Sequence, residues 1–183
     1  MKKTALVSLL GLAIAASAGA AVLKTDATKS TVTATFKQMN VPVESPFKKF
    51  DAAIDYNPSA PDAAKATVNV DTASLDLGEA DMNKEVAKKE WFNSAQFPKA
   101  SFVSTGIRSA GAGKLTVTGK LTIKGRVADV TFPLSVKTEG GKQVFDGALP
   151  IKRLAYNIGE GEWKDTSMVA DEVTIKFHVV AGQ

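Results

Sequence analysis

The 183-residue sequence has a single histidine, His178, and no cysteine, so the common ligands and nucleophiles of enzymes are scarce. His178 stands between Phe177 and Val179 in a run of alternating apolar residues, which places its side chain on the polar side of a strand. No Gly-x-Ser-x-Gly motif accompanies it, and one histidine without cysteine does not make a zinc site. We therefore expect a solvated surface histidine, with no catalytic residue, no metal and no cofactor.

Two other segments resemble ligand-binding motifs. Gly111-Ala112-Gly113-Lys114 looks like part of a phosphate loop, but Arg108 stands where the first glycine belongs and a strand pattern follows, so we predict a hairpin turn. An acidic segment lacks the alternating Asp/Asn spacing of a calcium loop. Its members are Glu160, Glu162, Asp165, Asp171 and Glu172. Neither segment predicts a binding site.

Carboxylates also gather at Asp76, Glu79 and Asp81, a spacing that could serve acid/base chemistry. They precede a run of good helix formers, so a turn followed by a helix cap explains them more simply. Asp81 is expected as the N-cap of a helix over residues 82–92, which ends before Pro98. Trp91 stands at the end of this helix, which is therefore expected to cap one mouth of a barrel.

The first twenty residues have the pattern of a secretory signal peptide. Met1-Lys2-Lys3 is a basic start, residues 5–16 form an uncharged Leu/Ala-rich run, and Ala18-Gly19-Ala20 is a small-residue cleavage site. The apolar run is shorter than the about 20 residues that span a bilayer, and no later segment is apolar enough to do so. We expect residues 1–20 to be cleaved before Ala21 and residues 21–183 to be exported to the periplasm without a spanning segment.

The charge balance of the mature chain excludes a broad class of partners. Cleavage removes Lys2 and Lys3 and no acid, so 23 basic residues become 21 against 19 acidic ones, a net charge of +2. A general nucleic-acid binder needs a stronger positive field, so we expect no nucleic-acid partner. No linker or repeat interrupts residues 21–183, which are predicted to form one domain.

Alternation of apolar and polar residues with period two predicts about eight strands in an all-β domain. The expected strands are residues 31–37, 50–56, 66–71, 102–107, 115–124, 130–136, 145–151 and 173–179. The short turns between them favour antiparallel pairing, because parallel strands need long crossovers. Such a sheet closes into a barrel or splits into a sandwich, and alternation leaves both open.

A basic stripe is expected on the outer face of one strand. Lys120, Thr122 and Lys124 share the polar parity, and Arg126 follows in the next turn. Such a stripe either meets anionic lipid head groups or is a solvated sheet face that resists edge pairing.

The size of the residues at inward-facing positions decides whether a barrel has space for a ligand. These positions include the small residues Ala34, Ala52, Ala66, Gly119 and Ala148, which leave volume unfilled and favour a cavity unless bulky partners match them. The residues expected to bind a ligand in an apolar lumen are Ala34, Phe36, Phe50, Ile54, Val68, Val70, Phe102, Leu121, Ile123, Phe132, Leu134 and Phe177.

A series of segments carries a resemblance through its order and spacing. The segments are residues 47–50, 54–56, 68–78, 91–93, 97–102, 117–125, 169–173 and Ile151-Lys152-Arg153-Leu154-Ala155-Tyr156-Asn157-Ile158-Gly159. Over about residues 23–180 the chain resembles the YceI-like family. That resemblance implies a periplasmic, lipocalin-like antiparallel barrel that binds polyisoprenoids and other amphiphilic lipids.

The resemblance also implies a mouth at which a polar head group is held. Arg153 and Tyr156 stand in its motif near the end of a strand, and Trp91 and Trp163 are aromatic candidates for the same rim. For Arg153, a structural ion pair with Asp171 or Glu172 is the alternative to head-group contact. Trp163 lines the mouth or plugs the core, and its indole N–H needs a partner in either position.

Three hypotheses about function follow. In the first, the protein is a periplasmic carrier that holds a polyisoprenoid, an isoprenoid quinone or a fatty chain in the barrel lumen. In the second, it is a stress-related structural or partner-binding β-domain with a filled core. In the third, it is an enzyme that acts on lipid-like substrates. The oligomeric state is open in all three.

Overall fold

The computed structural model describes residues 22–182, so the expected signal peptide lies outside the described residues. These residues form ten strands, one α-helix and four short 3₁₀ helices. The strands are β1 (Val22–Thr25), β2 (Thr31–Gln38), β3 (Val41–Pro46), β4 (Phe50–Asp55), β5 (Lys65–Asp71), β6 (Lys99–Ser109), β7 (Lys114–Ile123), β8 (Arg126–Glu139), β9 (Lys142–Lys152) and β10 (Val169–Gly182). The helices are α1 (Ala80–Val86), η1 (Pro61–Ala63), η2 (Thr72–Ser74), η3 (Arg153–Tyr156) and η4 (Gly161–Lys164).

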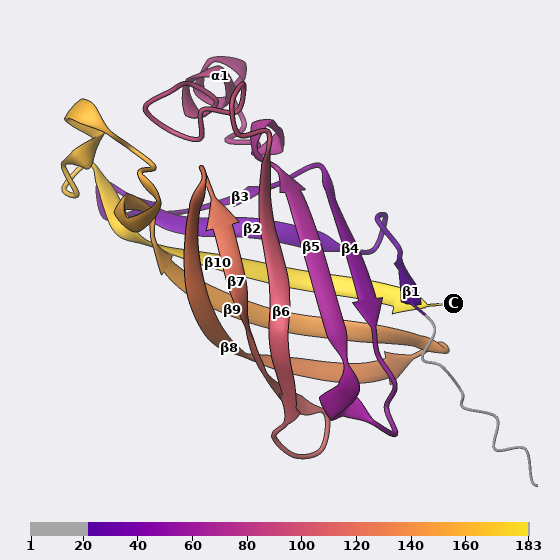
Figure 1. Cartoon of the computed structure of the whole chain (residues 1–183). Coiled ribbons are helices and arrows are strands. Elements are labelled where there is room, and N and C mark those ends of the chain that lie inside the picture. The colour runs from indigo at the N-terminus through magenta and orange to yellow at the C-terminus, as the bar shows by residue number, and fades with distance from the viewer. Residues whose placement is uncertain (1–21, 183) are drawn as a thin grey trace, which may run out of the picture.

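The strands close an antiparallel barrel, which decides between the two architectures that alternation left open. The sheet runs β1-β4-β5-β6-β7-β8-β9-β10, and β10 pairs back with β1 to complete the ring (Figure 1). Turn residues set several hairpins: Lys124 and Gly125, for example, both have positive φ between β7 and β8. The prediction of an antiparallel barrel of about eight strands with one short helix is confirmed.

Strand β10 is long enough to pair with two strands along the same edge. Its end pairs with β1 through Thr25 and Ala181, whereas its first half pairs with β2 through Ala34 and Ile175. Beyond β2 lies β3, which ends the sheet. Ring closure through β1 therefore occurs at one end of the barrel, and at the other end the β2–β3 hairpin extends the wall.

The expected strands correspond to β2 and β4 to β10, and the sequence pattern missed β1 and β3. Strand β1 has only four residues, too few for alternation to be recognised. Strand β3 contains Pro42 and Pro46 and lacks a regular apolar face, as is common in edge strands.

The α-helix is shorter than predicted, and Asp81 is not its cap. Helix α1 begins at Ala80 after Glu79 and ends at Val86. The N–H of Phe92 then donates to the carbonyl of Val86, and Asn93 has a φ of 50°, so the chain turns repeatedly. These turns direct both Trp91 and Phe92 toward the barrel. In a continued helix, two adjacent residues do not point to the same side.

Aromatic rings fill the part of the barrel remote from α1. The ring of Phe132 packs edge-on against those of Phe102 and Phe177, with centroids 5.4 and 5.5 Å apart. A Cβ added at Gly119 would lie 2.5 Å from the Phe102 ring, and one at Gly147 would lie 2.3 Å from the Phe177 ring. The two glycines therefore make room for the phenylalanines.

This packing corrects two expectations about small residues. Gly119 does not leave lumen volume unfilled, because Phe102 of the neighbouring strand occupies it. Ala148 is exposed, because it has the opposite parity to Phe145 and Leu149, and Gly147 is the inward residue of β9.

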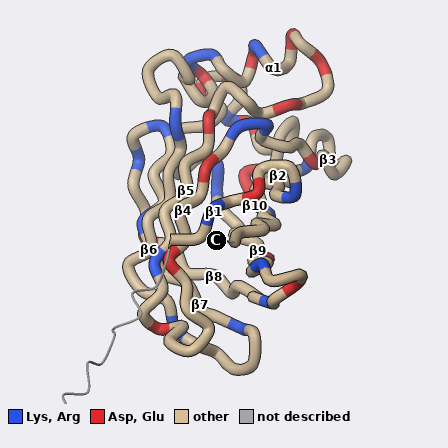
Figure 2. The backbone as a smooth tube through the Cα atoms, turned by 90° about the vertical axis from the view of Figure 1, so that its right-hand side faces the viewer, with Lys and Arg blue, Asp and Glu red and all other residues tan. Residues whose placement is uncertain are grey.

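The outer face of the barrel carries charges of both signs (Figure 2). Lys120 pairs there with Asp129 at 2.9 Å, and half-exposed His178 contacts Asp146 at 2.6 Å, so the surface position expected for this histidine is confirmed. The expected basic stripe is wrong at Lys124, whose side chain is only 6% exposed because it turns toward the loops at the barrel end. Within residues 22–182, no helix has the length and hydrophobicity needed to cross a membrane.

The contact between Gly119 and Phe102 predicts the effect of a single methyl group. Gly119→Ala should lower the free energy of unfolding by about 1–3 kcal/mol, because the Cβ overlaps both the Phe102 ring and the Val103 carbonyl. Urea denaturation measures this, with Ala148→Val on the exposed side of β9 as the control that should change little. Equal stability of the two variants would show that the barrel accommodates the added methyl.

Candidate functional site

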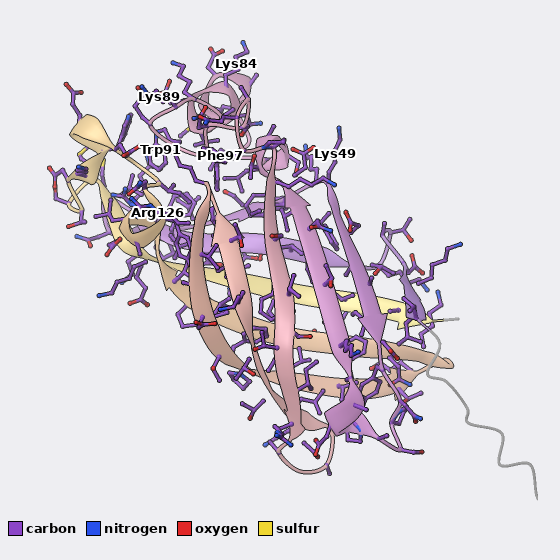
Figure 3. The ribbon with its side chains drawn as sticks, viewed as in Figure 1. Lys49, Lys84, Lys89, Trp91, Phe97 and Arg126 are labelled. Carbon is purple, nitrogen blue, oxygen red and sulfur yellow. The ribbon has the colours of Figure 1, made fainter. Side chains whose placement is uncertain are left out.

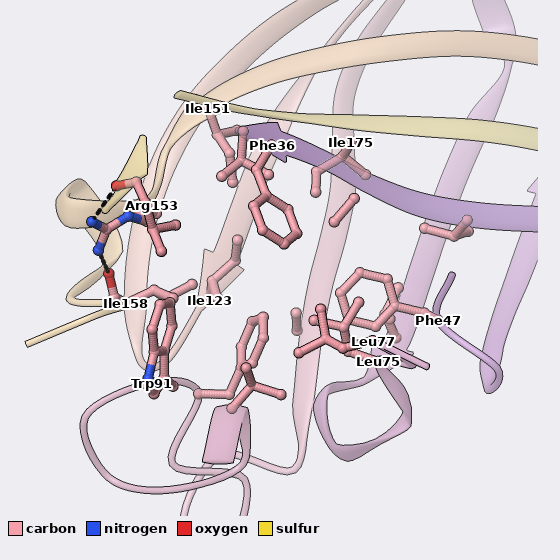
Figure 4. Close-up of a pocket in the computed structure, with 18 of the residues that line it drawn as sticks. Phe36, Phe47, Leu75, Leu77, Trp91, Ile123, Ile151, Arg153, Ile158 and Ile175 are labelled. Atoms are coloured by element: carbon pink, nitrogen blue, oxygen red, sulfur yellow. Dashed lines mark hydrogen bonds between the residues drawn. The ribbon is translucent and has the colours of Figure 1, made fainter. Parts of the chain in front are cut away.

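A cavity of about 280 Å³ lies inside the barrel at the end covered by α1 (Figure 4). Its wall is almost entirely apolar and comes from barrel strands and from the segments that cover them. The barrel contributes Val32, Ala34, Phe36, Val70, Ala100, Leu121, Ile123, Ile151, Val169, Val173 and Ile175. Phe36, Val173 and Ile175 are only partly buried although they face inward, since their side chains border the cavity.

The cover of the cavity is residues 76–97, here called the lid. It contributes Leu77, Met82, Val86, Trp91 and Phe92 to the cavity wall, and Phe92 packs edge-on against Phe47 at 6.2 Å. Figure 3 shows Lys84, Lys89, Trp91 and Phe97 together at this end of the barrel. The lid thus replaces water over the open end of the apolar interior.

One side of the lid is fixed by Asp76. Its carboxylate pairs with Lys48 at 2.6 Å and accepts a hydrogen bond from the Asn83 amide, whose oxygen accepts from the backbone N–H of Leu77. Lys48, Asn83 and the Gly78 N–H lower the pKa of Asp76 to about 2. Asp76 therefore has a structural role, whereas the cap predicted at Asp81 is wrong, because Asp81 lies within α1 and pairs with Lys84.

The other side of the lid is fixed to residues 153–169, here called the clasp loop. The carbonyl of Glu90 accepts from the backbone N–H groups of Gly159 and Glu160, both at 2.8 Å. The Lys124 ammonium donates to the carbonyls of Lys89 and Asn157, both at 2.7 Å, and to the Glu160 carboxylate at 2.9 Å. Lys124 therefore joins lid, clasp loop and barrel.

Arg153 holds the clasp loop itself. It is 2% exposed, and its Nε donates to the carbonyl of Ala170 at 3.1 Å. Its two terminal nitrogens donate to the carbonyls of Ile158 and Gly159 and to those of Trp163 and Val169, at 2.7 to 3.4 Å. All five N–H groups of the guanidinium are thus used within the protein.

The surroundings of Arg153 bear on the two alternatives raised by the sequence. Within residues 22–182, no acid lies at ion-pair distance from its guanidinium, and Asp171 accepts instead from the Leu154 N–H at 3.0 Å. Burial lowers the pKa of Arg153, and the charge of Asp171 opposes that shift. The guanidinium lies 5.7 Å from the centre of the Trp91 ring, which packs on Trp163 at 5.2 Å.

Three of the five acids in the acidic segment, which the sequence did not predict to bind calcium, have structural partners. Glu160 meets Lys124, Asp165 accepts from the Ser167 N–H, and Asp171 accepts from Leu154. In the part of the chain that the structure describes, no three His, Asp or Glu side chains are placed to hold a metal ion.

Five of the expected lumen residues lie on the cavity wall, and the other seven do not. On the wall are Ala34, Phe36, Val70, Leu121 and Ile123. In the packed interior are Phe50, Ile54, Val68, Phe102, Phe132, Leu134 and Phe177. Of the expected mouth residues, Arg153, Trp91 and Trp163 border the cavity, and Tyr156 is buried in the core.

Sequence reasoning missed the contribution of the lid and of the segments beside it. Phe47, Leu75, Leu77, Met82, Val86 and Phe92 all line the cavity. Met82 and Val86 have the i, i+4 spacing of one helix face, which was the available signal. No periodicity indicated Leu75 and Leu77, because they lie in an extended segment between η2 and α1.

Comparison with known proteins identifies the family and supports the fold. Residues 23–181 match the profile of a family described as YceI-like domain. A UPF0312 protein of Shewanella sp. strain W3-18-1 is 32% identical over 142 residues, which are 75% of this chain and 72% of that protein. The crystal structure of BcnA from Burkholderia cenocepacia is 54% identical, with a TM-score of 0.84, over 86% of this chain and 99% of that one.

A more distant structure shares the fold. It is described as a polyisoprenoid binding domain from Saccharophagus degradans and is 15% identical, with a TM-score of 0.68. The match covers 87% of this chain and 97% of that one. At this identity the similarity shows the barrel architecture alone.

The five hydrogen bonds of Arg153 predict that lysine cannot replace it. Lysine has three donors, so Arg153→Lys should leave buried carbonyls unpaired and lower the free energy of unfolding by about 2–4 kcal/mol. Thermal and urea denaturation measure this, with exposed Arg126→Lys as the matched control. Unchanged stability together with weaker binding of a lipid that has a polar head would instead support head-group contact.

The pair of Lys124 and Glu160 predicts an acid-sensitive clasp. Lys124 lowers the pKa of Glu160 from its usual 4.5, so the pair stabilises the clasp above pH 4.5 and loses this effect as pH falls through the lowered pKa. Hydrogen exchange should show falling protection of the Gly159 and Glu160 amides in that range. Lys124→Met should lower their protection at neutral pH and remove this acid dependence, whereas Lys120→Met should not. Protection that does not change with pH in the parent protein would contradict the assignment.

Proposed function

Because this chain belongs to the YceI-like family, we propose that it binds the apolar chain of an amphiphilic lipid in the cavity under its lid and carries it through the periplasm. The observation that supports this most directly is the cavity of about 280 Å³, whose wall is apolar on both the barrel and the lid side. The ligand classes are those expected from the sequence: a polyisoprenoid, an isoprenoid quinone or a fatty chain. The polyisoprenoid-binding description of one structural neighbour agrees with this choice.

The energetics of burial favour such a ligand. Burial of one five-carbon isoprene unit at about 0.8 kcal/mol per CH₂ contributes roughly 3–4 kcal/mol. Association costs about 4–15 kcal/mol. Two or three units buried in the cavity outweigh this cost when it lies toward the lower end of that range. Contacts that the rest of the lipid makes at the rim would add to this.

Binding without catalysis is the role that the polar groups near the cavity support. The polar side chains on the wall are those of Gln38, Glu85 and Arg153. Glu85 pairs with Lys88, and the guanidinium of Arg153 is fully used by backbone carbonyls. A reaction needs groups that are free to exchange protons with a substrate, whereas Gln38 is a neutral amide, Glu85 is paired within the lid and Arg153 holds the clasp loop.

Transport through the periplasm rests on residues 1–20. Their basic start, apolar run and Ala18-Gly19-Ala20 site fit export followed by cleavage. An exported carrier must shield an apolar chain from water, and the lid covers the end of the barrel at which the cavity lies.

A partner-binding β-domain with a filled interior is the competing function. The aromatic packing around Phe132 fits that alternative for one half of the barrel. The cavity under the lid favours the carrier, because the interior of a filled domain is packed without an apolar space of this size.

Ala34 provides the test, since it lies on the cavity wall with its neighbour Phe36. Ala34→Trp should fill volume meant for the ligand, so lipid recovered by organic-solvent extraction and mass spectrometry should fall severalfold while circular dichroism and the melting temperature change little. The control is Thr31→Trp on the exposed side of β2, which should keep the parent lipid content. Parent lipid content in Ala34→Trp, with a stability loss of about 1–3 kcal/mol from overpacking, would favour the filled domain.

A further inference from the structure

We propose that Phe177, together with Phe102 and Phe132, forms a floor that limits the length of lipid chain the cavity accepts. This inference rests on the proposed function and makes it more specific. The Phe132 ring of β8 lies edge-on to the Phe102 ring of β6 and to the Phe177 ring of β10, with centroids 5.4 and 5.5 Å apart.

The position of the floor follows from strand parity. On β10, Val173 and Ile175 line the cavity, and Phe177 is the next inward residue. On β6, Ala100 lines the cavity and Phe102 is the next inward residue. Inward side chains of a strand lie two residues apart, so Phe177 and Phe102 each lie one inward position beyond the last cavity-wall residue of their own strand.

On strand β7, the cavity wall also ends one inward position before the floor, and the residue at that position is a glycine. Ile123 and Leu121 line the cavity, and the next inward residue is Gly119, whose place is taken by the Phe102 ring. Gly147 on β9 accepts the Phe177 ring in the same way, since a Cβ there would lie 2.3 Å from it. The glycines thus let two large rings cross an interior that is otherwise just wide enough for ordinary side chains.

Phe177 is the member of the floor that faces both parts of the barrel. It packs against the main core and also against the cluster of Val32, Ala34, Phe47 and Leu75 that borders the cavity. It pairs with Val32 across the sheet on one side and with Gly147 on the other. Removal of its ring would therefore add the volume of the ring to the cavity.

The volume above the floor sets the expected chain length. A buried apolar cavity of about 150 Å³ holds one benzene, so 280 Å³ corresponds to about twelve carbon atoms. The substrate class is accordingly a lipid whose buried apolar part has about twelve carbons, such as two or three isoprene units. A longer chain must displace the rings or leave its remainder outside.

A homologous series of probes measures the floor directly. The two tryptophans of the sequence, Trp91 and Trp163, both line the cavity, so their fluorescence reports binding there. Saturated primary alkanols of about eight to about eighteen carbons should bind the full-length mature protein about fourfold more tightly per added CH₂, up to about twelve carbons, and level off beyond that length.

Phe177→Ala should move this plateau toward longer alkanols by about four to six carbons, because the space of one ring becomes available. Phe177→Leu should give a smaller shift in the same direction and serves if the alanine variant does not fold. Phe145→Ala is the matched control: Phe145 is buried against Tyr56 at 5.4 Å and lies three inward positions beyond Ile151, the cavity-wall residue of β9, so its loss should lower stability without moving the plateau.

The outcomes separate the floor from the function on which it rests. Failure of every alkanol to change the fluorescence of the parent protein would overturn lipid binding in the cavity, and the floor with it. Binding that strengthens through the whole series without a plateau, or a plateau that is the same in the parent and both Phe177 variants, would overturn the floor and leave lipid binding intact.

Discussion

The fixed width of an eight-stranded barrel is the constraint on which this structure depends. Its interior has room for one layer of side chains or for a slender ligand, but not for both at the same level. Here the two contents are separated along the barrel axis. Phe102, Phe132 and Phe177 fill one half, seated against Gly119 and Gly147, and an apolar cavity remains in the other half. Gly119, which was expected to leave space for a ligand, instead leaves space for an aromatic ring, and Gly147 does the same.

The lid over this cavity is held by more than apolar contacts. Two buried cations anchor it through hydrogen bonds. Arg153 gathers five backbone carbonyls of the clasp loop and of the start of β10, and Lys124 joins that loop to the lid. Buried charges are costly to desolvate, so their full hydrogen bonding is what makes the positions tolerable. The same bonding leaves these groups little capacity to recognise a ligand directly.

Much of the barrel was predictable because period two is a local property. The apolar runs of β2 and of β4 to β10 predicted the inward faces of these strands, with Ala148 of β9 as the exception, and the glycine turn at residues 124–125 predicted its hairpin. The candidate site was predicted only in part: Ala34, Phe36 and Leu121 lie on the cavity wall, whereas Phe102 and Phe177 have the same parity and lie below it. Parity states which side of the sheet a residue faces, but not its height along the barrel axis relative to the lid.

The sequence by itself therefore determined the strands, their inward faces and the family, since alternation, turn residues and motif order are all encoded along the chain. Only the tertiary structure decided where the interior is filled and where it is hollow. That division depends on which residue lies across the sheet from each glycine, on the turns after Val86 that direct Trp91 and Phe92 inward, and on the carbonyls that converge on Arg153. Contacts between neighbouring strands fix the first, and hydrogen bonds of irregular spacing within the loops fix the other two, so no regular sequence period contains them.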